Sequence, residues 1–467
     1  MISKIESTNL IPFLMVFFSL VRPVANAQET VIDRYIAQAV ESSAALKQEQ
    51  LSYEKSLYSL KEAKRMFFPT VSIVAEYSFN SGGITIDMPF GDMMNPAYDN
   101  LNLVNGINSG QVPNYPTIPN YPSIENTEIP FLFEEEQRTQ IQFEMPIYNQ
   151  ALIHNKALQK QVTEVKKINA ASYKRELIKE VKSAYLDYKM AVQAVAVGKK
   201  ALELSANSLA VSNSLYRNNK ITADDVLKAK AKVKEVENSI LEINKGVILT
   251  KAYFNFLLNR KYNEEIELDE AFSINSFLLE NLDALLETAL RNRDELKLIQ
   301  HSLLIDEISI NMEKNDALPL LYLNGSTGYW STDYSYNNEA LFGSVSLSMK
   351  WDIFTSGKRN SKIQQAKIDK LISLEKRRDM ENNISIQVID AYNNVKTAKE
   401  SVELLKMKTE NYRASLEIIE KKKTQGMATQ LAYDIAFTDY FESEISLIKE
   451  ENQYHQKIIE LEYSINN

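Results

Sequence analysis

Two copies of one pattern follow each other in this sequence, and this duplication constrains the fold more than any other feature. The copies align at an offset of 250 residues near their beginnings and at about 207 residues further on. Matching pairs are Ala39 with Ala289, Leu46 with Leu296, Pro69 with Pro319, Val181 with Val388, Ala184 with Ala391 and Tyr185 with Tyr392. We therefore expect a two-fold internal repeat, with residues 28–270 as the first copy and 271–467 as the second.

Each copy contains a helical stretch too long for a compact domain. Residues 150–218 contain no Pro, and as one helix they would be about 100 Å long at 1.5 Å per residue. Long helices of this kind are typical of coiled-coil or tubular packing. Helices are predicted over residues 29–66, 150–218, 223–258, 284–316, 357–424 and 429–465.

Sharp turns are predicted after the two longest helices. Asn219 and Gly426 stand where each helix must end in a left-handed conformation, which Asn and Gly adopt most easily. Thr222 precedes Asp225 at the spacing of a capping box, so the next helix is expected to begin there.

Four short segments alternate between apolar and polar residues. They are residues 69–80, 138–147, 320–330 and 344–353. Each has about 10 residues, the length that a tilted strand needs to cross a bilayer. The alternation fits either a transmembrane barrel or a half-buried strand of a soluble sandwich. Export of the chain and the adjoining long helices favour the barrel. Four strands cannot close a barrel, so several copies of the chain are expected to share one.

The N-terminus predicts export. Lys4 precedes an apolar run from Leu10 to Val21, and Ala25-Asn26-Ala27 follows, which indicates a signal peptide over residues 1–27. The alternative, a membrane anchor, requires about 20 apolar residues. The chain has no Cys, which excludes disulfides and thiolate metal sites.

The two copies differ by an insertion. The offset falls from 250 to 206 between Pro69 and Phe143, so the first copy holds about 44 additional residues. This segment, residues 81–137, is rich in Pro, Asn, Tyr and Gly. Such composition predicts an irregular loop, expected outside the cell.

The sequence shows no arrangement of residues that indicates catalysis. His154, His301 and His455 lie in separate helical stretches, and no nucleotide-binding or zinc-protease motif occurs. The net charge of −9 argues against nucleic acid as a partner. We expect no enzyme activity, no cofactor and no metal site.

Four short motifs occur in duplicated order: Arg293-Asp294-Glu295-Leu296, the strand endings Pro146-Ile147-Tyr148 and Asp352-Ile353-Phe354-Thr355-Ser356-Gly357-Lys358-Arg359, and the turn motif from Tyr216 to Ala229. With these motifs the chain resembles the TolC-type outer membrane efflux protein family over essentially the whole mature sequence. The resemblance implies a fold of mixed α and β type, with a long helical coiled-coil tunnel and a transmembrane β-barrel shared between protomers, each giving four strands. It further implies a homotrimer in the outer membrane, extending into the periplasm and docking to a periplasmic adaptor protein and an inner-membrane transporter.

The resemblance also suggests site residues. An acid at the position of Asp225 helps to hold the periplasmic entrance shut in the family, and Asp224 is its neighbour. In the second repeat the family's acidic positions fall on Ala432 and Ile435, with Asp434 nearby, and Lys423 replaces the usual aromatic residue. The residues expected at the helix-turn tips, for docking of adaptor or pump, are Asn219, Lys220, Gly426 and Met427.

The function expected from these features is a passive exit duct for small molecules, driven by an inner-membrane pump. The same architecture would serve type I export of a polypeptide. A soluble periplasmic coiled-coil scaffold is a third possibility, which the four alternating strands disfavour.

Overall fold

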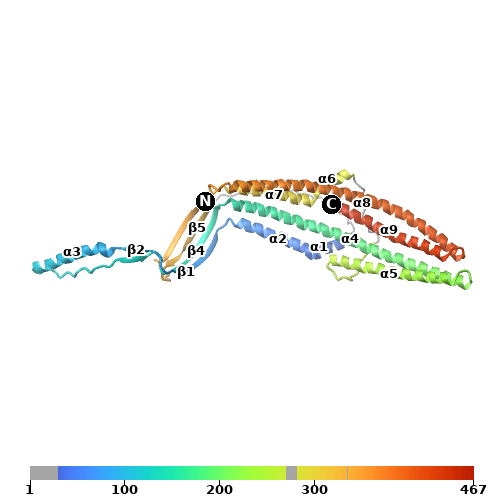
Figure 1. The fold of residues 1–467 in the computed structure, drawn as a ribbon, viewed down its shortest axis with the longest axis horizontal. Helices are drawn as coiled ribbons and strands as arrows, with labels where there is room; N and C mark the ends of the chain where they lie inside the picture. Colours follow the sequence, from blue (N-terminus) through green and yellow to red (C-terminus); the bar gives the residue numbers. More distant parts are fainter. Residues whose placement is uncertain (1–29, 270–280, 334, 467) are drawn as a thin grey trace, which may run out of the picture. The chain divides into compact units, whose positions relative to one another are not determined.

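The computed structural model describes residues 30–269, 281–333 and 335–466, so the expected signal peptide lies outside the described residues. The chain divides into two units. Of the described residues, those within 1–50, 169–296 and 380–467 form the helical unit, and those within 51–168 and 297–379 form the strand unit. Each unit takes residues from both repeats (Figure 1).

The secondary structure follows the predicted order in both repeats. The helices of the described residues are α1 (Val31–Ser42), α2 (Ala44–Arg65), α3 (Phe90–Gln111), α4 (Gln150–Arg217), α5 (Ala223–Leu257), α6 (Leu282–Asn292), α7 (Asp294–Asn315), α8 (Lys358–Thr424) and α9 (Gln430–Ser464). The strands are β1 (Thr70–Phe79), β2 (Thr85–Met88), β3 (Thr127–Pro130), β4 (Glu135–Tyr148), β5 (Leu320–Ser331) and β6 (Leu341–Lys350). The predicted long helices are confirmed as α4 and α8.

Two helices expected to be continuous are each broken, and the breaks lie at equivalent positions of the repeat. The predicted helix over 29–66 stops at Ser43, which has an extended backbone and accepts a hydrogen bond at its hydroxyl from the Leu46 N–H (3.2 Å). The predicted helix over 284–316 stops at Arg293. Its guanidinium donates to the Ser464 carbonyl at 3.1 Å and to Glu295. Local capping and a long-range contact therefore override the helical pattern.

The cores of the helical unit confirm the duplication. Val181 of α4 lies fully buried in a cluster with residues of α1 and α5, including Phe254. Its equivalent, Val388 of α8, lies fully buried in a cluster with residues of α6 and α9, including Leu461. A third cluster joins the two repeats near the turns, where Phe437 of α9 packs with residues of α4, α5 and α8.

The four predicted strands form one antiparallel sheet in the order β1-β4-β5-β6. The end of the fourth strand is the main difference from the prediction, because β6 stops at Lys350 rather than at residue 353. Lys350 pairs with Leu320, the first residue of β5, so the neighbouring strand offers no partner beyond it. The carbonyl of Asp352 instead accepts a hydrogen bond from Arg359 (2.8 Å).

The insertion contradicts the prediction of an irregular loop over residues 81–137. It contains the helix α3 and the antiparallel pair of β2 with β3, and β4 already begins at Glu135. In the strand unit these elements project from the end of the sheet where β1 stops (Figure 1). Side-chain hydrogen bonds from asparagines, which sequence patterning does not reveal, hold the helix in place.

Candidate functional site

The pairing register of the sheet separates apolar from polar side chains. Ile73 of β1 pairs with Ile141 of β4, and Val345 of β6 pairs with Gly325 of β5, so these positions share one face. Ile73 and Val345 are 75% and 74% exposed. A soluble sheet would cover such residues, since burial of a large aliphatic side chain contributes about 1.5–3 kcal/mol.

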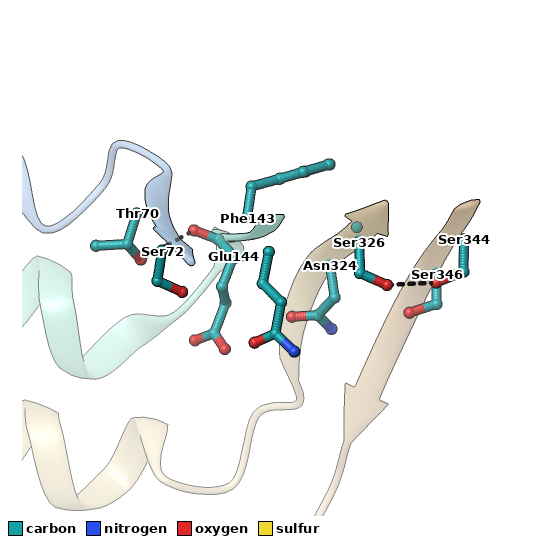
Figure 2. Close-up of a pocket in the computed structure, with 10 residues that line it drawn as sticks. Thr70, Ser72, Phe143, Glu144, Asn324, Ser326, Ser344 and Ser346 are labelled. Carbon is teal, nitrogen blue, oxygen red and sulfur yellow. Dashed lines mark hydrogen bonds between the residues drawn. The ribbon is translucent and has the colours of Figure 1, made fainter. Parts of the chain in front are cut away.

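The opposite face is polar and hollow. It borders an open hollow of about 400 Å³ that extends across all four strands. The polar side chains that line it are those of Thr70, Ser72, Gln142, Glu144, Asn324, Ser326, Ser344 and Ser346. Figure 2 shows the labelled polar side chains on one side of the strands, and Phe143 pointing to the other. The hydroxyls of Ser326 and Ser344 are hydrogen-bonded across two strands at 2.9 Å. Hydroxyl and amide groups, together with the carboxylate of Glu144, make this face suited to water.

Phe143 and Gly325 fit together on the apolar face. The Phe143 ring occupies the space that a side chain at Gly325 would need. The residues pair directly across β4 and β5. An aromatic ring over a glycine fills the gap in a sheet face, which keeps the apolar surface continuous.

The outer strands of the sheet have one paired side each. Among the described residues, β1 pairs with β4 and β6 pairs with β5, which leaves one edge of each strand without a neighbouring strand. Unpaired backbone groups in hydrocarbon cost several kcal/mol each. A sheet that enters a membrane in this form therefore needs strands from other copies at both edges.

The turns that follow α4 and α8 have the predicted geometry. Asn219 and Gly426 have positive φ values of 54° and 76°. The N–H of Lys220 donates to the Leu215 carbonyl (3.0 Å), and the N–H of Met427 donates to the Lys422 carbonyl (2.8 Å). These six-to-one hydrogen bonds define Schellman motifs, so both helices end by the same device. The turns lie at the same end of the unit (Figure 1).

A buried lysine is the main feature that sequence reasoning missed near these turns. Lys423 of α8 is 3% exposed. Its ammonium group donates to the Ser208 hydroxyl and lies 4.3 Å from the ring centre of Tyr433. Burial lowers the pKa of Lys423 to about 8, although Asp434, Glu420 and Asp225 attract its charge.

Polar groups of α4 and α9 surround this lysine of α8. Gln430 accepts a hydrogen bond from the Ser212 hydroxyl (3.0 Å) and donates one to the Asp434 carboxylate (2.8 Å). Burial raises the pKa of Asp434 above its ordinary range. The sequence feature that could have indicated these buried polar groups is a series of serines at helical spacing on α4. All three are buried: Ser205, Ser208 and Ser212. We call Ser208, Ser212, Lys423, Gln430, Tyr433 and Asp434 the tip cluster.

The other predicted acids lie on the surface of the same region. The Asp225 carboxylate accepts hydrogen bonds from the Thr222 N–H (3.2 Å) and hydroxyl (3.0 Å), which confirms the predicted capping interaction. Asp224 forms an ion pair with Lys228 at 2.7 Å, with both side chains more than half exposed. The structure thus places Asp225 and Asp224 at the start of α5 and Asp434 inside the tip cluster.

The histidines are separated, as their sequence positions suggest. His301 lies against Gln161 (2.8 Å) and His154 against Asn315 (2.8 Å), between helices of the strand unit. His455 lies in the helical unit, where burial lowers its pKa. No group of three metal-binding side chains occurs among the described residues. Within the same residues, no helix is both long and apolar enough to cross a membrane.

The comparisons with known proteins agree with this architecture. Residues 285–467 match the model of the outer membrane efflux protein family. No curated protein sequence matches the chain. Solved structures match over nearly the whole chain at low sequence identity, which shows a common fold.

Three solved structures illustrate the similarity. A membrane protein from Pseudomonas aeruginosa is 15% identical with a TM-score of 0.74, covering 94% of this chain and 93% of that one. The outer membrane protein VceC from Vibrio cholerae is 12% identical with a TM-score of 0.71, covering 93% and 96%. The MtrE outer membrane channel from Neisseria gonorrhoeae is 13% identical with a TM-score of 0.72, covering 93% and 89%.

Proposed function

We propose that this chain is one protomer of a homotrimeric exit duct in the outer membrane. Its second repeat matches the model of the outer membrane efflux protein family, and its fold matches those of solved outer-membrane proteins over nearly the whole chain. Small molecules cross the duct passively. An inner-membrane transporter supplies the energy, and a periplasmic adaptor protein joins the two.

The observation that carries this proposal is the sheet with one exposed apolar face, one polar hollow face and two open edges. Strands β1 and β6 of neighbouring copies can pair edge to edge, which satisfies the backbone groups that lipid would leave unpaired. The apolar face then contacts lipid, and the hydroxyl-rich face lines the water-filled path.

The helical unit supplies the periplasmic part of the path. Its turns carry Asn219, Lys220, Gly426 and Met427, all exposed, and we assign them to docking of the adaptor or the transporter. Asp224, Asp225 and Asp434 lie in the same region and are the candidates for closing the entrance.

Neighbouring residues of β1 provide a matched test. Ser72 lines the polar cavity, whereas Ile73 points to the apolar face. Arginine on the lipid face of a barrel costs about 2–4 kcal/mol near the membrane centre. We expect Ile73→Arg to abolish the trimer in outer-membrane fractions. Ser72→Arg should assemble normally and shift the ion selectivity of the channel in planar bilayers towards anions.

Two results would contradict the proposal. The first is a monomeric mass of the purified wild-type protein in detergent, since a shared barrel requires several copies. The second is normal assembly of the Ile73→Arg variant, since it would mean that the exposed apolar face does not contact lipid.

A further inference from the structure

The insertion forms an arm in which a helix is held along one side by an extended segment. The arm comprises residues 81–133, with α3 followed by the segment 112–126 and then β3. It projects from the end of the sheet opposite the one where β4 continues into α4 (Figure 1). In an assembled duct the arms of all copies would leave the same rim of the barrel.

Asparagines fix one face of α3 to the extended segment. Asn95 donates to the Ile124 carbonyl (2.9 Å) and accepts from the Ile124 N–H (2.8 Å). Seven residues later, Asn102 makes the same pair of hydrogen bonds with Tyr121, at 2.9 Å and 2.8 Å. Because the two asparagines are two helical turns apart, they define a single face, and that face is satisfied within the chain.

Close approach at the start of the helix supports the same arrangement. Gly91 is buried, and a side chain there would collide with the Ile124 carbonyl and crowd Asn126. Tyr98 stacks on Tyr121 with ring centres 5.1 Å apart. The extended segment is thus a fixed part of the arm and covers the asparagine face along its length.

The opposite face of α3 is exposed and has coiled-coil spacing. Its residues recur at intervals of three and four, the spacing of the core positions of a heptad. Met93 is 70% exposed and Val104 is 51% exposed. We call this face the seam, and its residues are Phe90, Met93, Ala97, Asn100, Val104 and Ile107.

The composition of α3 shows that the helix depends on packing. It contains Pro96, three glycines and five asparagines within its 22 residues. Glycine and proline disfavour a helix interior by about 1 and 3 kcal/mol relative to alanine, and isolated helices are marginal in water. The extended segment stabilises one face, so a contact on the seam would supply the remaining packing.

The charges of the arm favour another copy of the chain over a membrane surface as the partner. Residues 81–133 contain five acidic residues and no Lys, Arg or His. Helices that lie on membranes carry Lys and Arg on their polar face and are drawn to anionic lipids. The acids Asp92 and Asp99 lie on the asparagine side of the helix, and the seam itself carries no charge.

From these observations we propose that the α3 helices of neighbouring copies pack through the seam into one parallel helical bundle beyond the barrel rim. The proposal rests on the shared barrel proposed above, which brings the arms together in the same direction. Asn100 occupies a core position of the seam. By heptad spacing this is a d position, so the asparagines of neighbouring copies would face one another in the core of the bundle.

The absence of cysteine from the chain makes a direct test possible. Val104→Cys places a thiol in the seam, and Leu103→Cys places one on the flank of the helix, where Leu103 is 63% exposed. Mild oxidation of intact cells should cross-link about two of every three chains of the Val104→Cys variant into disulfide-linked dimers. The Leu103→Cys variant should remain monomeric in non-reducing gels.

The outcomes separate this proposal from the function on which it rests. An oligomeric mass in detergent without cross-linking of Val104→Cys would overturn the bundle and leave the duct intact. A monomeric mass would overturn the duct. Equal cross-linking of both variants would overturn the seam, because proximity alone would explain it. Quenching of a fluorophore on Val104→Cys by spin-labelled lipid would place the seam on the membrane and also overturn the bundle.

Discussion

Replacement of Lys423 by methionine should change how the stability of the protein depends on pH. Methionine has a similar length and no charge, so it keeps the packing among Ser208, Tyr433 and the surrounding helices while removing the buried ammonium. Burial lowers the pKa of Lys423 from 10.5 to about 8. The folded protein therefore binds this proton more weakly than the unfolded chain does.

The sign and size of the effect follow from this difference. Below pH 8 the lysine is charged in both states, and its burial opposes folding by about 3 kcal/mol, which is the free-energy equivalent of the pKa difference. Between pH 8 and pH 10.5 the unfolded chain holds more protons, so the stability of the wild-type protein rises through that window. The lost hydrogen bond to Ser208 costs the variant about 1 kcal/mol at every pH. Lys423→Met should thus be more stable than wild type by about 2 kcal/mol at pH 7, and less stable by about 1 kcal/mol above pH 10.5.

Thermal unfolding measured by circular dichroism at one heating rate, from pH 7 to pH 10.5, tests the prediction. A chain of this size has an unfolding entropy of roughly 0.9 kcal/mol per degree, so the Tm difference between variant and wild type should change by about 3 °C over this range. Lys422→Met removes a neighbouring exposed lysine and should follow the wild-type curve. A Tm difference for Lys423→Met that does not vary with pH would refute the reasoning, since it would mean that the ammonium is not buried in its charged form.

Two further predictions concern the turns. Asp225→Ala removes the carboxylate that binds the N–H and hydroxyl of Thr222, so it should destabilise α5 by about 1 kcal/mol. The same variant should raise single-channel conductance in planar bilayers. Unchanged conductance would leave Asp225 with a capping role alone. Gly426→Ala forces a side chain into a left-handed backbone and should destabilise the protein by about 1 kcal/mol, measured by chemical denaturation. Asn219→Gly is its matched control, because glycine adopts the same conformation more easily than asparagine, and a loss of stability there would argue against backbone strain as the cause.

The strands could be predicted from the sequence because one face of the sheet is apolar and the other is polar, so the residue types alternate along each strand. Alternation of apolar and polar residues is enough to assign Ile73 and Ser72 to opposite faces of β1. The end of β6 could not be predicted in this way. Its apolar pattern continues to Ile353, but hydrogen bonding stops where β5 begins, at Leu320. Register depends on the partner strand, and the pattern of one strand does not contain that information.

The helix α3 was not predictable because its composition resembles a loop. Its stabilising hydrogen bonds join Asn95 and Asn102 to backbone groups 29 and 19 residues away. Propensity describes what a residue does locally, and here long-range contacts outweigh it. The break at Arg293 also involves a long-range contact, with the Ser464 carbonyl, whereas Ser43 is held locally by the Leu46 N–H. The two breaks differ in this respect although the offset of 250 residues makes the positions equivalent in the sequence.

The tip cluster was only partly visible in the sequence. The position of Lys423 before the turn could be read directly, but its burial depends on α4, whose Ser208 is 215 residues away. The series of serines on α4 is the only local sign that a polar group packs there. A lysine beside a helix end is expected to interact with the last carbonyl groups, and nothing in its own neighbourhood predicts that it turns inwards.

The three predicted acids differ in what binds them within the chain, and this difference bears on how the entrance could close. Asp225 caps α5, so a contact with another copy would have to compete with the hydrogen bonds from Thr222. Asp434 is bound by Gln430 near the buried ammonium of Lys423, and its withdrawal would remove the carboxylate that compensates this charge most strongly. Asp224 is held by the exposed pair with Lys228, and exposed ion pairs contribute only about 0–1 kcal/mol. A cation of a neighbouring copy could replace Lys228 at little cost. We therefore propose that Asp224 makes the contacts that form and break as the entrance closes and opens, while Asp225 stabilises α5 and Asp434 stabilises α9.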